Sequence, residues 1–168
     1  FTYVLNRHGE TITEWNNSRY LKQDTLVHGK IFKPDPLTVL LQTYGGIYID
    51  DTDKNLAWFA PAYQNADILA TYETSNSTFY LENNLVVIDD FDPPNLAPAT
   101  SLTPDFYFNR SESGFEDVNV LYHITAFHDY IASLGYDTLL DDGITVDTHG
   151  MLGADNSVFN RNGGSPTL

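Results

Sequence analysis

The chain has 168 residues, no cysteine, and a formal net charge of −15 from 23 acidic and 8 basic side chains. This composition excludes disulfides, zinc–thiolate sites and cysteine nucleophiles, and it lacks the basic footprint of a nucleic-acid-binding protein. The 42% hydrophobic content predicts one folded domain over residues 1–168, or a fragment of one, with residues 150–168 as a loop-rich tail. No apolar run reaches transmembrane length, so we expect no membrane insertion by this segment.

The first half of the chain predicts two helices between two strands. Residues 2–5 are typical of a strand, and Asn17 or Ser18 could cap a helix that runs to about Val27. A second helix is marked by Asp35 as N-cap and Pro36 in the first turn, and it ends at a pair of glycines. Residues 47–50 follow as an apolar strand.

The second half predicts two more strands and one long helix. Residues 67–72 and 85–88 have strand composition, whereas the proline-rich stretch 89–105 indicates a loop. Ser113 and Glu116 match a capping box that opens a helix over about 115–134. Strands that alternate with helices favour an α/β fold with a mostly parallel sheet flanked by helices.

Three carboxylates cluster at Asp50, Asp51 and Asp53, directly after the apolar strand. Hard oxygen ligands in a tight group suit Mg²⁺, Mn²⁺ or Ca²⁺. Successive strand residues point to opposite faces, so Asp51 and Asp53 can share one cation, while Asp50 lines a ligand site or caps the turn. An EF-hand calcium loop is disfavoured because Leu56 occupies the position that requires glycine.

The segment Phe32–Asp53 combines Asp35, an apolar helix that ends in Tyr-Gly-Gly, and the sequence Ile-Tyr-Ile-Asp-Asp-Thr-Asp. It resembles the sugar-transferase region with a DxD motif that yeast-type α-mannosyltransferases and the glucosylating domains of large clostridial toxins share. The family spacing places the second aspartate at position 52, which is Thr52 here, so the motif is either displaced by one residue or interrupted. Thr38 stands where the family usually has arginine.

This resemblance implies a small or truncated GT-A fold and a nucleotide-sugar donor, UDP- or GDP-linked. It also implies Mn²⁺ or Mg²⁺ at the motif and sugar transfer to a glycan or protein hydroxyl, with retention of configuration. It implies donor contacts from Asp35 and Tyr48, and from Asn84 near the donor sugar. A C-terminal loop of GT-A enzymes often supplies a further ligand, for which three residues are candidates: His149, Asp155 and Asn156. The sequence assigns no nucleophile or base.

A second class of function stays open on the sequence alone. A secreted module could hold Ca²⁺ at residues 50–53 and bind carbohydrate through its many aromatic side chains, and a transferase-like domain without turnover is a third alternative. Asn16, Asn76 and Asn109 each begin an Asn-x-Ser/Thr sequon, which favours a secretory-lumen or extracellular location. Trp58 could stack on a base or a sugar, or belong to the core.

Overall fold

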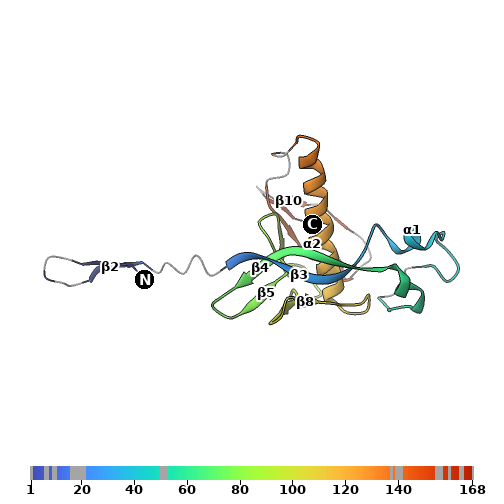
Figure 1. Cartoon of the computed structure of the whole chain (residues 1–168), viewed down its shortest axis with the longest axis horizontal. Helices are drawn as coiled ribbons and strands as arrows, with labels where there is room; N and C mark the ends of the chain where they lie inside the picture. The colour runs from blue at the N-terminus through green and yellow to red at the C-terminus, as the bar shows by residue number, and fades with distance from the viewer. Residues whose placement is uncertain are drawn as a thin grey trace.

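The computed structural model describes residues 2–5, 8, 11–15, 22–49, 53–136, 138, 142–153, 157–158, 160–162 and 165–167. Figure 1 shows its strands and helices, and the architecture is mixed α/β. The strands are β1 (Thr2–Leu5), β2 (Thr11–Trp15), β3 (Lys22–Phe32), β4 (Tyr63–Glu73), β5 (Thr78–Tyr80), β6 (Val86–Ile88), β7 (Thr100–Ser101), β8 (Asp105–Phe106), β9 (Ile144–Val146), β10 (Asn160–Asn162) and β11 (Ser165–Thr167). The helices are α1 (Pro36–Leu40), the 3-10 helix η2 (Ala57–Ala62), α2 (Gly114–Ser133) and α3 (Gly150–Gly153).

The central layer is a 5-stranded sheet in the order β7-β5-β4-β3-β8. In this sheet β3 pairs with β8 in parallel, and the other pairs are antiparallel. A 4-stranded sheet has the order β10-β11-β9-β6, with parallel pairing of β6 to β9 and β9 to β11. β1 and β2 form a hairpin sheet of their own. The prediction of a mostly parallel sheet is therefore wrong for the central layer. The antiparallel pairing of β3 with β4, which runs over the whole length of both strands, dominates this sheet.

The core lies where α2 packs on the central sheet (Figure 1). Along β3, Val27, Gly29 and Ile31 are buried at every second position, which is the period of a strand with one covered face. A Cβ at Gly29 would lie 2.7 Å from Val118 Cγ1 of α2, so this glycine allows the helix to approach the strand closely.

Several predicted elements are confirmed, and others are corrected. The strand predicted at 2–5 is β1, the one at 67–72 lies within β4, the one at 85–88 contains β6, and the long helix is α2. β9 is a strand that the sequence analysis does not predict. The helix predicted to end at Val27 is wrong over residues 22–27, which belong to β3, and its start lies outside the described residues. The loop predicted over residues 89–105 holds the short strand β7 and the start of β8.

Two predicted caps differ in outcome. The Asp35 side chain accepts a hydrogen bond from Thr38 N at the start of α1, as the sequence predicts, although α1 ends at Leu40 with Leu41 in the left-handed region. The Ser113 side chain makes no capping bond to α2, so the capping box does not form. Its would-be partner Glu116 is instead paired with Arg110.

Residues 47–49 do not form the predicted strand. Gly45 and Tyr48 exchange two backbone hydrogen bonds of 3.0 Å each in a tight turn, and Gly45 and Gly46 have φ of 129° and 63°. Ile47 is 69% exposed, and among the described residues the only β-bridge of this segment is the one between Gly45 and Tyr48. The tail predicted as loop-rich from residue 150 contains α3, β10 and β11 in the part that the structure describes.

Among the described residues, no helix combines the length and the apolar character that crossing a membrane requires.

Candidate functional site

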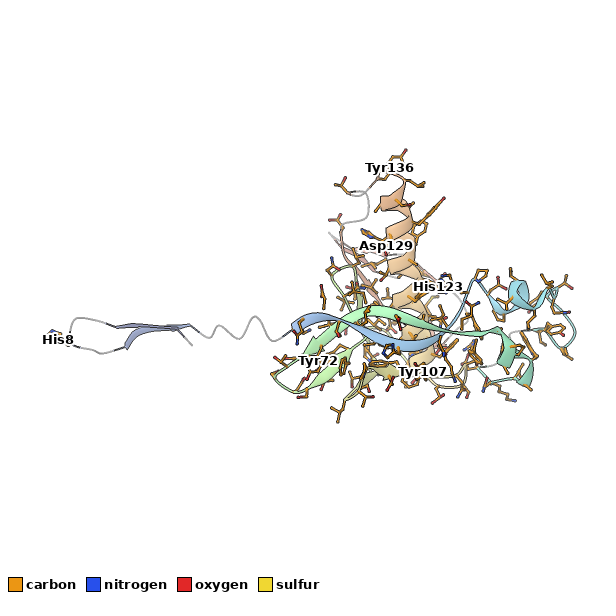
Figure 2. The ribbon with its side chains drawn as sticks, in the orientation of Figure 1. His8, Tyr72, Tyr107, His123, Asp129 and Tyr136 are labelled. Atoms are coloured by element: carbon orange, nitrogen blue, oxygen red, sulfur yellow. The ribbon has the colours of Figure 1, made fainter. Side chains whose placement is uncertain are left out.

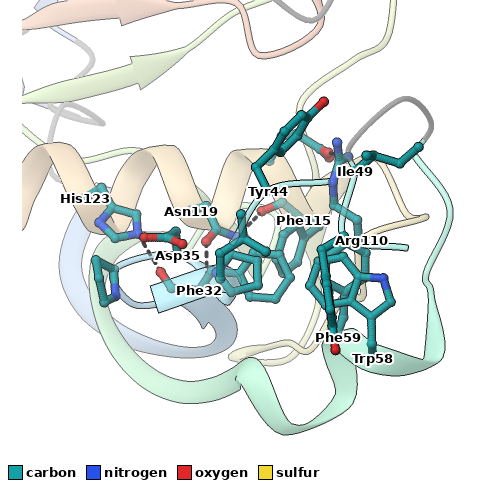
Figure 3. A pocket seen from close by; sticks show the side chains of 15 residues that line it. Phe32, Asp35, Tyr44, Ile49, Trp58, Phe59, Arg110, Phe115, Asn119 and His123 are labelled. Carbon is teal, nitrogen blue, oxygen red and sulfur yellow. Dashed lines mark hydrogen bonds and ion pairs between the residues drawn. The ribbon is translucent and has the colours of Figure 1, made fainter. Parts of the chain in front are cut away.

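Two pockets meet along one side of α2. The smaller, the aromatic pocket, has a volume of about 390 Å³ and is lined by Phe32, Pro34, Asp35, Pro36, Leu37, Tyr44, Tyr48, Ile49, Trp58, Phe59, Arg110, Phe115, Glu116, Asn119 and His123. The larger, the acidic pocket, has a volume of about 1010 Å³ and includes five carboxylates in its lining: Asp53, Asp92, Glu112, Glu116 and Asp147. Figure 3 shows the aromatic pocket and the α2 side chains that border it.

Stacked rings form one wall of the aromatic pocket. The Phe32 ring lies 4.9 Å from the Tyr63 ring at an interplanar angle of 21° and 5.0 Å from the Phe115 ring at 69°. Tyr48 meets Trp58 edge to face, with ring centroids 5.1 Å apart. These pairs come from β3, β4, α2 and the segment that contains η2, so the wall is held by several elements. Offset and edge-to-face pairs of this kind are favourable arrangements of aromatic quadrupoles.

Asp35 brings an ionised carboxylate to this pocket. Its Oδ1 accepts from Thr38 N at 2.9 Å, and its Oδ2 accepts from the Thr38 hydroxyl at 2.6 Å. The hydroxyl bond, followed by the backbone bond, lowers the pKa of Asp35 below its usual value. Thr38 therefore stabilises the charge of Asp35.

Three polar residues on one face of α2 border both pockets: Glu116, Asn119 and His123. Asn119 Oδ1 accepts from Phe32 N at 3.0 Å, and His123 Nε2 donates to Phe32 O at 2.8 Å. Figure 2 shows His123 on α2, and Figure 3 shows both bonds to Phe32. They satisfy the backbone polar groups at the end of β3 and fix that strand end against the helix.

Arg110 lies between two carboxylates at the junction of the pockets. Its Nη1 is 2.5 Å from Glu116 Oε1 and 2.9 Å from Asp53 Oδ1. The Arg110 backbone N–H donates to Tyr63 Oη at 2.9 Å, which ties the residue to β4. Burial raises the pKa of Glu116, and the charge of Arg110 offsets part of this effect.

The loop around α3 closes the far side of the acidic pocket. Asp147 accepts from the backbone N–H groups of Phe91, Asp92 and His149, and Asp92 Oδ2 accepts from Met151 N at 2.7 Å. The acceptor oxygens of Asp147 thus serve the loop, whereas the Glu116 carboxylate faces both pockets and can contact a ligand there.

The structure brings some of the predicted site residues together. Asp35 and Tyr48 line the aromatic pocket, whereas Asp53 and His149 line the acidic pocket. Asn84 is exposed near the start of β6 and is not among the described residues that line either pocket. Its neighbour Asn83 is buried, and its side chain bonds Leu69 O and Thr125 Oγ1. The remaining predicted residues lie outside the described residues: Asp50, Asp51, Asp155 and Asn156.

The described residues do not by themselves form a cation site. Among them, no group of three or more His, Asp or Glu side chains could hold a metal ion. The Asp53 side chain is 83% exposed, and one of its oxygens faces the Arg110 guanidinium. A cation at Asp53 would therefore compete with a positive charge that is already there, and Asp53 as a metal ligand stays a prediction.

The sequence does not predict the residues at the centre of the site. Arg110 lies within the sequon that begins at Asn109, Glu116 is predicted only as half of a capping box, and Asn119 carries no predicted role. A signal was present, because residues 116, 119 and 123 recur at the spacing of one helix face. The partner of that face could not be read from the sequence, since Phe32 lies on a distant strand.

Comparison with protein-family models, with curated proteins and with solved structures gives no match to this chain.

Proposed function

We propose that this chain is a GT-A-like glycosyltransferase domain whose aromatic pocket binds the nucleoside and sugar of a UDP- or GDP-sugar. In this proposal the sugar passes, with retention of configuration, to a hydroxyl of a glycan or protein in the acidic pocket. One observation carries the proposal: Asp35 and Tyr48, the donor contacts implied by the sequence resemblance, line the same pocket. No nucleophile or base is assigned.

The size and lining of the aromatic pocket suit such a ligand. Its volume of about 390 Å³ falls within the usual range for small-molecule sites. A base or a sugar ring can stack on the exposed parts of Tyr44, Tyr48 or Trp58, and aromatic stacking contributes about 1–3 kcal/mol per base in nucleic-acid complexes. The alternative of a purely structural aromatic cluster predicts no ligand response from these side chains.

Asp35 supports the recognition of hydroxyl groups. Each carboxylate oxygen has two acceptor sites, and Thr38 takes one on each oxygen. The remaining capacity can accept hydrogen bonds from ribose or hexose hydroxyls. Because the pKa of Asp35 is lowered, it remains an ionised acceptor below the pH at which an ordinary aspartate is protonated.

The test is a binding titration with an internal reporter. The chain has 2 tryptophans, so Trp15→Phe leaves Trp58 as the single tryptophan. We expect UDP or GDP to change Trp58 fluorescence and to raise the melting temperature, because a ligand that binds only the folded state stabilises it. Both ligands are titrated with and without Mn²⁺, which tests the metal dependence that the DxD resemblance implies.

The control variant is Asp35→Asn, which keeps the size of the side chain but removes its charge. It should weaken the response to UDP or GDP, whose ribose hydroxyls Asp35 can bind, more than the response to the free base uracil or guanine. If neither UDP nor GDP changes fluorescence or melting temperature, with or without Mn²⁺, the transferase proposal is wrong.

A carbohydrate-binding module without transfer is the second candidate, and the aromatic lining favours it as well. It predicts that a mannose or glucose oligosaccharide, with or without Ca²⁺, raises the melting temperature while UDP and GDP have no effect. A domain that keeps nucleotide binding but lacks turnover would respond to UDP or GDP and release no sugar from UDP-glucose or GDP-mannose.

A further inference from the structure

The two pockets share a boundary. Four residues line both of them: Arg110, Glu116, Asn119 and His123. A ligand that fills the aromatic pocket with its rings and extends toward the acidic pocket must pass this boundary. The chemistry of these four side chains therefore decides which group a ligand can place between its two ends.

Arg110 is the single lysine or arginine among the described residues that line the two pockets. The lining of the acidic pocket includes five carboxylates, and the whole chain carries a net charge of −15. An anionic group at this boundary would be repelled by its surroundings unless a positive charge faced it. Arg110 is the fixed cation that the described lining supplies for that purpose.

Two carboxylate partners of Arg110 lie among the described residues, and they differ in exposure. The Glu116 side chain is 26% exposed, whereas that of Asp53 is 83% exposed. The Arg110 side chain itself is 14% exposed, so only the Asp53 end of that pair lies in solvent, where water and salt screen its charge. Asp53 can therefore be exchanged for another anion at low cost, whereas Glu116 keeps the guanidinium in place.

The main chain at Arg110 is also anchored. Tyr63 Oη accepts from Arg110 N and donates to Asn55 Oδ1 at 2.7 Å, and burial raises the pKa of Tyr63, so the phenol keeps its proton at neutral pH. An arginine fixed at its backbone and by Glu116 is pre-organised, and less side-chain entropy is lost when it binds an anion.

We propose that Arg110 binds the diphosphate of the nucleotide-sugar, with phosphate oxygens replacing Asp53 as the partner of its guanidinium. Guanidinium and phosphate form charge-assisted bonds with matched geometry, which makes arginine well suited to this role. The inference rests on the proposed function, because the aromatic pocket must receive the nucleoside for the diphosphate to lie at this boundary.

The experiment compares three probes, UDP, uridine and inorganic pyrophosphate, by isothermal titration calorimetry. The proteins are the unmodified chain, Arg110→Gln and Arg110→Lys. We expect Arg110→Gln to weaken UDP and pyrophosphate about tenfold or more and to leave uridine within about twofold, because only the phosphate contact is lost. Arg110→Lys should lie between, since it keeps the charge and loses the planar fork.

The matched control is Lys54→Gln, which removes one positive charge beside Asp53 from an exposed position that lines neither pocket. It should leave all three affinities within about twofold. Circular dichroism and urea unfolding of each variant identify any loss of fold, and Arg110→Lys supplies the comparison if Arg110→Gln does not fold.

The outcomes separate this inference from the proposed function. If the unmodified chain binds UDP and both Arg110 variants bind it equally well, the inference is wrong and the proposed function stands. If the variants lose as much affinity for uridine as for UDP, Arg110 affects the pocket as a whole, and the proposed contact with phosphate is wrong. If the unmodified chain binds neither UDP nor GDP, the proposed function fails and this inference fails with it.

Discussion

The aromatic and acidic pockets border the same face of α2 and differ in almost everything else. The aromatic pocket is walled by rings that also pack against each other, so its shape is part of the core. The acidic pocket is bordered by loops whose carboxylates bond backbone N–H groups, as Asp92 and Asp147 do. The wall of the aromatic pocket is thus held by packed rings, and the wall of the acidic pocket is held by hydrogen bonds from carboxylates to the backbone.

Helix α2 therefore borders two pockets that suit different chemical groups of a ligand. Asn119 and His123 fix the end of β3, which carries Phe32 into the aromatic pocket, while Glu116 and Arg110 bring charge to the boundary. Flat rings suit a base or a sugar, whereas carboxylates suit a hydroxyl-bearing acceptor. The contrast predicts that changes in the aromatic pocket will affect folding more than changes in the acidic pocket.

The largest expected effect comes from Phe115→Ala. Phe115 is 3% exposed and packs edge to face on Phe32 and Tyr63. Its removal should lower the free energy of unfolding by about 3–5 kcal/mol, through lost burial and the cavity that remains. Urea unfolding measures this change. Leu96→Ala, at a position in the acidic pocket that is 45% exposed, is the control and should cost less than about 1 kcal/mol. Equal losses would contradict the contrast between the pockets.

A smaller loss should follow Asn119→Leu, which removes the acceptor of Phe32 N. The partly buried N–H is then left without its partner, and the free energy of unfolding should fall by about 1–3 kcal/mol. Urea unfolding is again the measurement, with the exposed Asn95→Leu as the matched control. If both variants are equally stable, the link from α2 to β3 does not position the aromatic pocket.

Glu116→Gln tests the charge at the boundary through pH. Burial raises the pKa of Glu116 above its usual value of 4.5, so the native state binds more protons than the unfolded state just above that pH. The contribution of Glu116 to stability therefore falls as the pH rises through the folded-state pKa. Relative to the unmodified chain, the free energy of unfolding of Glu116→Gln should therefore rise as the pH increases above 4.5, and urea unfolding measures this difference.

Glu112→Gln, an exposed acidic neighbour in the same pocket, controls for the loss of one negative charge. A Glu116→Gln difference that is constant with pH, or that has the opposite slope, would show that burial does not control the titration of Glu116.

The smallest expected effect is on Asp35. Thr38→Val removes the hydroxyl that donates to Asp35 Oδ2, which is the largest cause of its lowered pKa. The pKa of Asp35 should rise toward its ordinary value while the Thr38 N–H bond remains. An NMR titration of the Asp35 carboxyl measures the change, and Thr43→Val on the following turn is the control. An unchanged pKa would mean that the hydroxyl does not hold the charge at the aromatic pocket.

Local signals predicted a substantial part of the fold. Asp35 caps α1 because its side chain reaches Thr38 N within the same turn, and this requires nothing from the rest of the chain. The strand segments 67–72 and 85–88 were also predicted, from their apolar and β-branched residues, and α2 was predicted from the helical spacing of its apolar residues. The segment 22–27 misled because its apolar residues are too few to separate a helix from the outer part of a strand.

The apolar run 47–49 is the opposite case, because its residues predict a strand that the structure does not contain. Its β-branched and aromatic residues favour a strand, but a strand needs a neighbour, and the structure gives this segment a two-bond turn between Gly45 and Tyr48 instead. The predicted metal ligands Asp50 and Asp51 follow that turn and lie outside the described residues.

The sequence by itself determined the elements with local causes, the acidic balance, and the presence of Asp35 and Tyr48 near a glycine turn. Only the tertiary structure decided that Arg110 forms ion pairs with both Asp53 and Glu116, and that α2 is hydrogen-bonded to the end of β3. The physical reason is that caps and periodicity depend on neighbours in sequence. Ion pairs and pocket walls depend on residues that only the packing of α2 against the sheet brings within hydrogen-bonding distance.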